Sequence, residues 1–138
     1  MKFQTLCITA LTALSFTACT LTPKKLPSGE LATAFVIEQH KDISAEPQTD
    51  HNLARLIKQS ENCDIEFTAY FQTGKATEHW LFKGDQLISA FSNVETETEK
   101  KQIIFDLNEE KSQSNFQALK KNFSKSKLDK CTFETAEN

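Results

Sequence analysis

The residues from Cys63 to Leu107 constrain the fold most strongly, because apolar and polar side chains alternate along them. In residues 63–72 every second side chain is apolar, and the others are polar or aromatic with a polar group. A period of two rich in β-branched and aromatic residues is typical of a half-buried strand. Shorter runs of the same character follow at residues 76–82, 86–92 and 102–107. We therefore expect four strands with one packed face and one wet face.

Short breaks that contain glycine decide how these strands are connected. The breaks are Thr73-Gly74-Lys75 and Lys83-Gly84-Asp85, and glycine readily adopts the positive φ that a tight hairpin needs. Parallel strands need a crossover of roughly a dozen residues or more. The sequence therefore predicts a four-stranded antiparallel meander over about residues 63–107.

The sequence does not decide which face of the third strand points inward. Leu87 and Phe91 form one apolar pair along it, and Ile88 and Ala90 form a competing pair on the other face.

Two helices are predicted to cover the meander, which makes the fold class α+β. The first begins at Thr49 or Asp50, either of which is a good N-cap. Its apolar face has the spacing i, i+3, i+4 and comprises Leu53, Leu56 and Ile57. The second spans roughly Glu109 to Lys125, with acidic residues at its start and basic residues at its end, as the helix dipole favours. Its apolar stripe comprises Phe116, Leu119 and Phe123.

The N-terminus has the character of an export signal. Met1-Lys2 supplies a positive charge, and the apolar stretch Leu6–Ala18 is 13 residues long, too short to span a bilayer as a helix. This stretch ends in Thr17-Ala18-Cys19, which resembles the lipobox of bacterial lipoproteins. The resemblance implies that Cys19 receives a diacylglycerol, that the signal peptide 1–18 is removed, and that the protein is anchored in a membrane by its acyl chains.

The resemblance divides the rest of the chain into a tether and a domain. Residues 19–30 include prolines and show no periodicity, which is typical of a tether that holds a domain off the membrane. Residues 31–138 then form a single α+β domain, and its first segment, 31–37, is either an edge strand or a helix. Thr20 stands where the inner-membrane retention signal of enteric bacteria has Asp, so the outer membrane is the implied location.

An ordinary cleaved signal is the alternative, with Ala13-Leu14-Ser15 as its candidate cleavage site. The chain has four cysteines, and Cys7 leaves with the signal in either case. If Cys19 is lipidated, Cys63 and Cys131 remain as a pair in an oxidising compartment, and we predict a disulfide between them. Two separate buried thiols are the alternative.

No residue pattern predicts an enzyme, a metal site or a cofactor. The three histidines, His40, His51 and His79, lack metal-ligand spacing. Glu66 and Glu78 form a carboxylate pair of the hydrolase kind only if the first hairpin brings them opposite one another. Surface charge is the alternative for this pair.

Two charged segments are further candidates for binding. Glu95, Glu97 and Glu99 place three carboxylates on one strand face, which attracts a basic partner or simply protects a strand edge. Basic residues in the C-terminal region form either a headgroup-binding patch or a solvated helix face. They are Lys120, Lys121, Lys125, Lys127 and Lys130.

The formal net charge of −3 gives no electrostatic reason to expect a nucleic-acid partner. The sequence, with the lipobox resemblance, instead leads us to expect a non-enzymatic lipoprotein of the cell envelope. Its domain faces the periplasm and binds a protein or another envelope component. The alternatives are a periplasmic inhibitor or immunity lipoprotein, and a carrier of a small apolar ligand held between sheet and helix.

Overall fold

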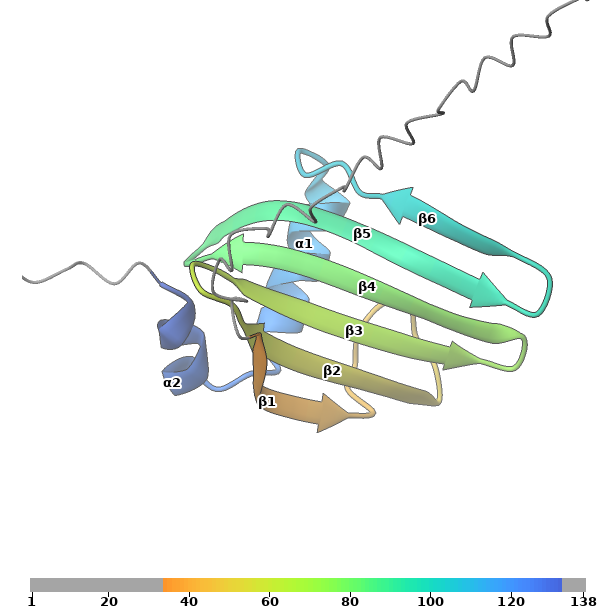
Figure 1. Ribbon diagram of the computed structural model, residues 1–138, viewed down its shortest axis with the longest axis horizontal. Coiled ribbons are helices and arrows are strands. Elements are labelled where there is room, and N and C mark those ends of the chain that lie inside the picture. The colour runs from red at the N-terminus through yellow and green to blue at the C-terminus, as the bar shows by residue number, and fades with distance from the viewer. Residues whose placement is uncertain (1–33, 133–138) are drawn as a thin grey trace, which may run out of the picture.

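The computed structural model describes residues 34–132, which form one six-stranded antiparallel sheet with its strands in sequence order (Figure 1). The strands are β1 (Phe35–Lys41), β2 (His51–Lys58), β3 (Cys63–Phe71), β4 (Gly74–Lys83), β5 (Gln86–Thr96) and β6 (Lys100–Ile104). The helices follow the sheet and are α1 (Glu110–Lys120), α2 (Lys125–Leu128) and the 3₁₀ turn η1 (Asp129–Cys131). Within residues 34–132, no helix is long and apolar enough to cross a membrane.

The prediction of an α+β fold, with a four-stranded meander and a helix on either side of it in sequence, was wrong, because the structure is mostly sheet. The four predicted strands are present as β3 to β6, but β1 and β2 extend the sheet. The segment predicted as the first helix is β2, which pairs with β3 from His51 opposite Tyr70 to Lys58 opposite Cys63. The segment 31–37 is strand, not helix, over the part that lies in β1.

The first helix was mistaken because β2 carries apolar side chains on both of its faces. Ala54 and Leu56 point into the core and are fully buried, whereas Leu53 and Ile57 lie on the other face and are half-buried. Two apolar faces in a short strand reproduce the helical spacing of Leu53, Leu56 and Ile57. Pairing with β1 and β3 decides the conformation, because each neighbour satisfies the backbone groups of β2.

A bulge in β5 settles which of its residues face inward. The register between β4 and β5 pairs Leu81 with Ser89 but Phe82 with Leu87, so Ile88 is the extra residue. Leu87 and Ala90 consequently both lie in the core, although they are three positions apart. Phe91 therefore points to the opposite face of the sheet.

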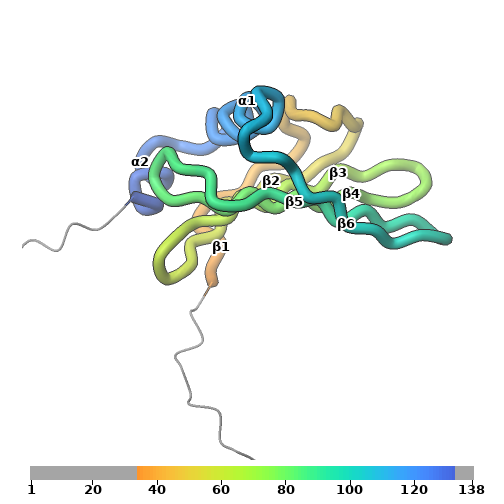
Figure 2. Tube along the Cα trace, turned by 90° about the horizontal axis from the view of Figure 1, so that it is seen from above, coloured from red at the N-terminus to blue at the C-terminus, as the bar shows by residue number. Residues whose placement is uncertain are grey.

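One face of the sheet is covered by α1, which lies across it as a second layer (Figure 2). Phe116 and Leu119 of α1, together with Phe123 beyond its end, are buried, which confirms the predicted apolar stripe. Phe116 lies against Phe82 with ring centroids 5.3 Å apart and against Trp80 at 6.5 Å. The helix is shorter than predicted, because the chain turns at Asn122, whose side chain donates to the carbonyl of Ala118.

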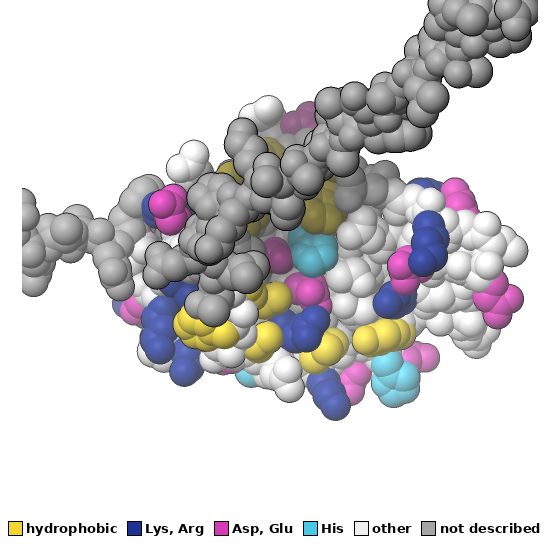
Figure 3. All heavy atoms as spheres, in the orientation of Figure 1, with side chains coloured by type: hydrophobic (Ala, Val, Ile, Leu, Met, Phe, Trp, Pro, Cys, Tyr) yellow, Lys and Arg dark blue, Asp and Glu magenta, His cyan; other side chains and the backbone are white. Residues whose placement is uncertain are grey.

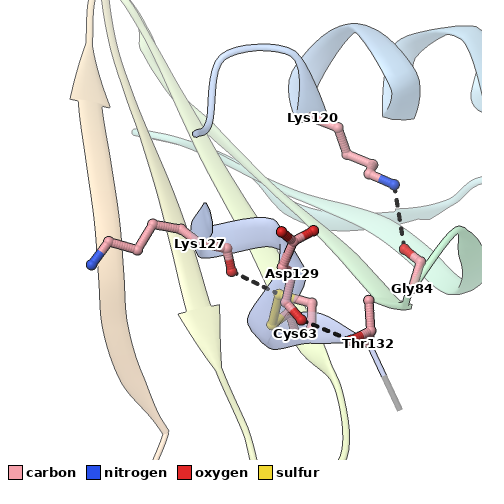
Figure 4. Close-up of a disulfide and its surroundings, with 7 residues drawn as sticks. Cys63, Gly84, Lys120, Lys127, Asp129 and Thr132 are labelled. Atoms are coloured by element: carbon pink, nitrogen blue, oxygen red, sulfur yellow. Dashed lines mark hydrogen bonds between the residues drawn. A yellow bond between two sulfur atoms is a disulfide. The ribbon is translucent and has the colours of Figure 1, made fainter. Parts of the chain in front are cut away.

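The C-terminal segment is fastened to the sheet beside the turn between β4 and β5 (Figure 4). A disulfide links Cys63, the first residue of β3, to Cys131 of η1, with their Cα atoms 5.5 Å apart. The carbonyl of Cys131 accepts a hydrogen bond from the backbone N–H of Gly84 at 2.8 Å. Lys120 Nζ donates to the carbonyl of Gly84 at 3.3 Å and to Asp85 Oδ1 at 2.9 Å.

We predict that Phe116→Ala lowers the free energy of unfolding by about 3–5 kcal/mol, because a fully buried aromatic side chain leaves a cavity. Urea denaturation followed by circular dichroism measures the change. Phe71→Ala is the control, since that ring is 45% exposed and its loss costs little. Equal losses for the two variants would contradict this account of the core.

We also predict that Cys63 and Cys131 form a disulfide in the mature protein. The bond spans a sequence separation of 68 residues, for which the chain-entropy model gives about 4 kcal/mol of stabilisation. Mass spectrometry after alkylation without reductant should show both thiols unmodified, and the Cys63→Ala/Cys131→Ala double variant should unfold at lower urea. Alkylation of both cysteines in the folded, unreduced protein would refute the prediction.

Candidate functional site

The two faces of the sheet differ in what covers them. Figure 1 and Figure 3 view the sheet from the side opposite α1, which no helix of residues 34–132 covers and which we call the open face. On this face acidic, basic and histidine side chains gather between hydrophobic ones (Figure 3). The strand period of two assigns alternate residues to it.

Two charged pairs on three neighbouring strands occupy the middle of the open face, and we call them the charged cluster. The register places Arg55 of β2 opposite Glu66 of β3, and Glu66 opposite His79 of β4. Arg55 donates to Glu66 Oε1 from Nε at 3.0 Å and also from Nη2. His79 Nδ1 lies 2.8 Å from Asp64 Oδ2.

The Asp64–His79 pair is fixed by further contacts. Asp64 is 7% exposed, and its second oxygen, Oδ1, accepts the backbone N–H of Trp80 at 3.0 Å. The imidazole of His79 stacks on Phe91 of β5 with ring centroids 4.9 Å apart. The Asp64 carboxylate raises the pKa of His79, because the hydrogen bond between them favours the protonated ring. The ring is therefore held in one place, and the contact with Asp64 favours its protonated form.

Apolar side chains surround the charged cluster on the open face. Val36 of β1 is 44% exposed, Tyr70 of β3 47% and Ile104 of β6 70%. Half-buried Leu53 and Ile57 lie on either side of Arg55 along the same face of β2. The charged pairs and these apolar side chains therefore share one face of the sheet.

Glu66 and Glu78 do not form a carboxylate pair. The register pairs Glu66 with His79 and Phe67 with Glu78, so the two carboxylates point to opposite faces of the sheet. A one-residue offset in a strand moves a side chain to the other face, which is why sequence alone left this pairing open.

Glu78 instead lies on the α1 side, among the core residues of β4. It is 7% exposed, and its Oε2 accepts a hydrogen bond from Trp80 Nε1 at 2.9 Å. Burial raises the pKa of Glu78 to about 7, although the Trp80 hydrogen bond acts in the opposite direction.

Two of the other charged candidates, Glu95 and Lys120, take part in local pairs. Glu95 lies between Lys75 and Lys100 at 3.3 and 3.4 Å, as expected for a protected strand end. Lys120 is held by Asp85, and its ammonium lies 5.3 Å from the centroid of the Phe116 ring, so it does not belong to a free basic patch.

The described residues contain no group of His, Cys, Asp and Glu side chains arranged to hold a metal ion. The histidines lie apart, with His40 beside Glu38 and His51 beside Asp42. The predicted lipidation site, Cys19, lies outside the described residues, as does the tether 19–30.

Sequence reasoning missed the charged cluster because it depends on strand register. The signal was nevertheless present: a loop of only Gln72 and Thr73 between β3 and β4 pairs Phe71 with Gly74. Counting back from that pair brings Glu66 opposite His79. The bulge in β5 then decides that Phe91 reaches the imidazole, and no sequence signal marks the bulge.

Comparison of the chain with protein-family models, with curated proteins and with solved structures finds no match.

We predict that Glu78→Gln removes most of the pH dependence of stability below neutrality. The carboxyl has a folded-state pKa of about 7 against an ordinary value of 4.5, so ionisation is harder in the fold. The contribution of Glu78 to stability is therefore highest below pH 4.5 and falls by about 3 kcal/mol in total as the pH rises through 7. The raised pKa of His79 acts in the same direction, so Glu78→Gln retains the part of the pH dependence that comes from His79.

Urea unfolding of both proteins at pH 5 and pH 8 tests this prediction. Glu97→Gln, an exposed carboxyl in the turn between β5 and β6, controls for the loss of one negative charge. Parallel pH profiles for wild type and Glu78→Gln would contradict the burial account.

Proposed function

We propose that this chain is a lipid-anchored protein of the bacterial cell envelope, whose domain binds another protein of the envelope through the open face of its sheet. The proposed location is the periplasmic side of the outer membrane. The observation that carries the binding part is the charged cluster, in which four side chains from three adjacent strands are fixed within an apolar surround.

The anchor rests on the sequence. Thr17-Ala18-Cys19 ends an apolar core at the place where a lipobox has its modified cysteine. Each buried methylene of an acyl chain contributes about 0.8 kcal/mol, so two or more chains hold a protein stably at a membrane. A partner confined to the same membrane region is then met at high effective concentration.

The binding surface rests on how the open face is built. In the Asp64–His79 and Arg55–Glu66 pairs each side chain already has its partner. Docking a protein on them therefore leaves no isolated buried charge. Side chains ordered before binding also lower the entropy cost of association. Ile104 and Tyr70 retain enough exposed apolar surface to contribute affinity.

A periplasmic inhibitor or immunity protein would use the same face against a toxin or hydrolase. The identity of the captured partner separates the two functions, since an envelope protein supports the first and a secreted toxin the second.

The experiment begins with Cys19→Ser, which should release the protein from the membrane to the soluble periplasmic fraction. Cys7→Ser is the control, because that residue lies in the signal and leaves the mature anchor intact. A Cys19→Ser protein that still floats with membranes would refute the anchor.

Capture of partners from detergent-solubilised envelope then tests the open face. Ile104→Glu places a charge on this face, where Ile104 lies opposite Phe91. Ile103→Glu is a matched control, because the neighbouring isoleucine lies opposite Ser92 and faces the α1 side. We expect Ile104→Glu to weaken capture at least tenfold, about 1.4 kcal/mol, and Ile103→Glu to retain it. If only Ile103→Glu loses capture of the partner, the interface lies on the α1 side of the sheet instead.

A further inference from the structure

A hollow of about 430 Å³ lies on the α1 side of the sheet, away from the open face. It is bounded by strands β4 to β6, by the first half of α1 and by the loop between β1 and β2 that contains Pro47. Its volume lies within the range of about 300–1,000 Å³ found for small-molecule sites. Apolar side chains make up much of its wall, including Val94, Ile103 and Phe105.

Glu78 also lines this hollow, and its carboxyl is held in a fixed position. Its Oε2 accepts the indole N–H of Trp80, and the Trp80 side chain is fully buried. The Trp80 ring stacks on Phe105 with centroids 5.0 Å apart, so it cannot turn away. Among the described residues, this is the only hydrogen bond to the Glu78 carboxyl, and Oε1 is left available to a ligand in the hollow.

The position of Glu78 is costly for the protein alone. Its neighbours on the same face of β4 are Ala76 and Trp80, and an apolar side chain in its place would avoid the desolvation of a carboxylate. A ligand that donates a charged hydrogen bond to Oε1 offsets that desolvation. Such bonds are roughly twice as strong as neutral ones.

The charged residues around the hollow decide the sign of the charge that a ligand should carry. Glu46 on the loop and Glu78 on the sheet are acidic, and Lys111 on α1 is the basic residue of the lining. No basic group contributes to the perturbed ionisation of Glu78, whose causes are burial and the Trp80 hydrogen bond. The excess of carboxyl groups favours a cation, and the apolar wall favours one that carries a hydrocarbon body.

We propose that this hollow binds a small primary amine with an apolar body, its ammonium on Glu78 Oε1 and its body against Val94, Ile103 and Phe105. The site is independent of the open face, so a partner protein and an amine are bound on opposite sides of the sheet. Because the ammonium pairs with the ionised carboxyl, binding at pH values below about 7 releases the Glu78 proton.

The test is isothermal titration of the full-length mature protein in detergent with 2-phenylethylamine, and with 2-phenylethanol as the neutral probe of matched size. We expect the amine to bind at least about tenfold more tightly than the alcohol, since only the amine gains the ion pair. Affinity for the amine should fall about tenfold from pH 8 to pH 6, as the ionised fraction of a carboxyl with a pKa of about 7 falls.

Glu78→Gln should abolish both the preference for the amine and the pH dependence of its affinity, whereas Glu97→Gln should retain both. Circular dichroism establishes that each variant is folded. Equal affinity for amine and alcohol in wild type, or an amine affinity that does not change with pH, would overturn the proposal without any variant. An unchanged affinity in folded Glu78→Gln would also overturn it.

Discussion

Burial of the aromatic side chains of β4 beneath α1 is the interaction on which the rest of the structure depends. Trp80 and Phe82 are fully buried, and Phe116 of α1 lies against both rings. A six-stranded sheet is wider than one helix of 11 residues, so other segments must cover its margins. The loop containing Ala45 covers one part, and the disulfide holds the C-terminal segment over another.

The alternation of side chains along β4 gives neighbouring residues separate tasks. Glu78 and Trp80 face α1, where they form a hydrogen-bonded pair in the core. His79 lies between them in sequence but faces the opposite side, where Asp64 and Phe91 hold its ring. One strand therefore supplies a buried carboxyl to a hollow and a fixed imidazole to an open surface, with a single layer of backbone between them.

The proposals depend on different parts of the chain, and each depends on a different physical interaction. The anchor depends on acyl chains at Cys19, and the partner surface depends on ordered charge pairs among apolar side chains. The hollow depends on the cost of burying Glu78, which an ammonium offsets.

The exposed edge strand β6 begins with Lys100 and Lys101, and charged side chains of this kind discourage pairing with the edge of another sheet.

The sequence by itself determined the strands β3 to β6 and the apolar stripe of α1, because each rests on a local period of two or 3.6 residues. It also marked Cys63 and Cys131 as a pair by counting cysteines. It did not determine the conformation of residues 51–58, where apolar side chains on both faces fit a helix as well as a strand. Tertiary structure decided that segment by pairing it with β1 and β3. Register, fixed by the turn at Gln72-Thr73 and by the bulge at Ile88, separated Glu66 from Glu78 and brought Asp64 to His79, because a shift of one residue exchanges the faces of a sheet.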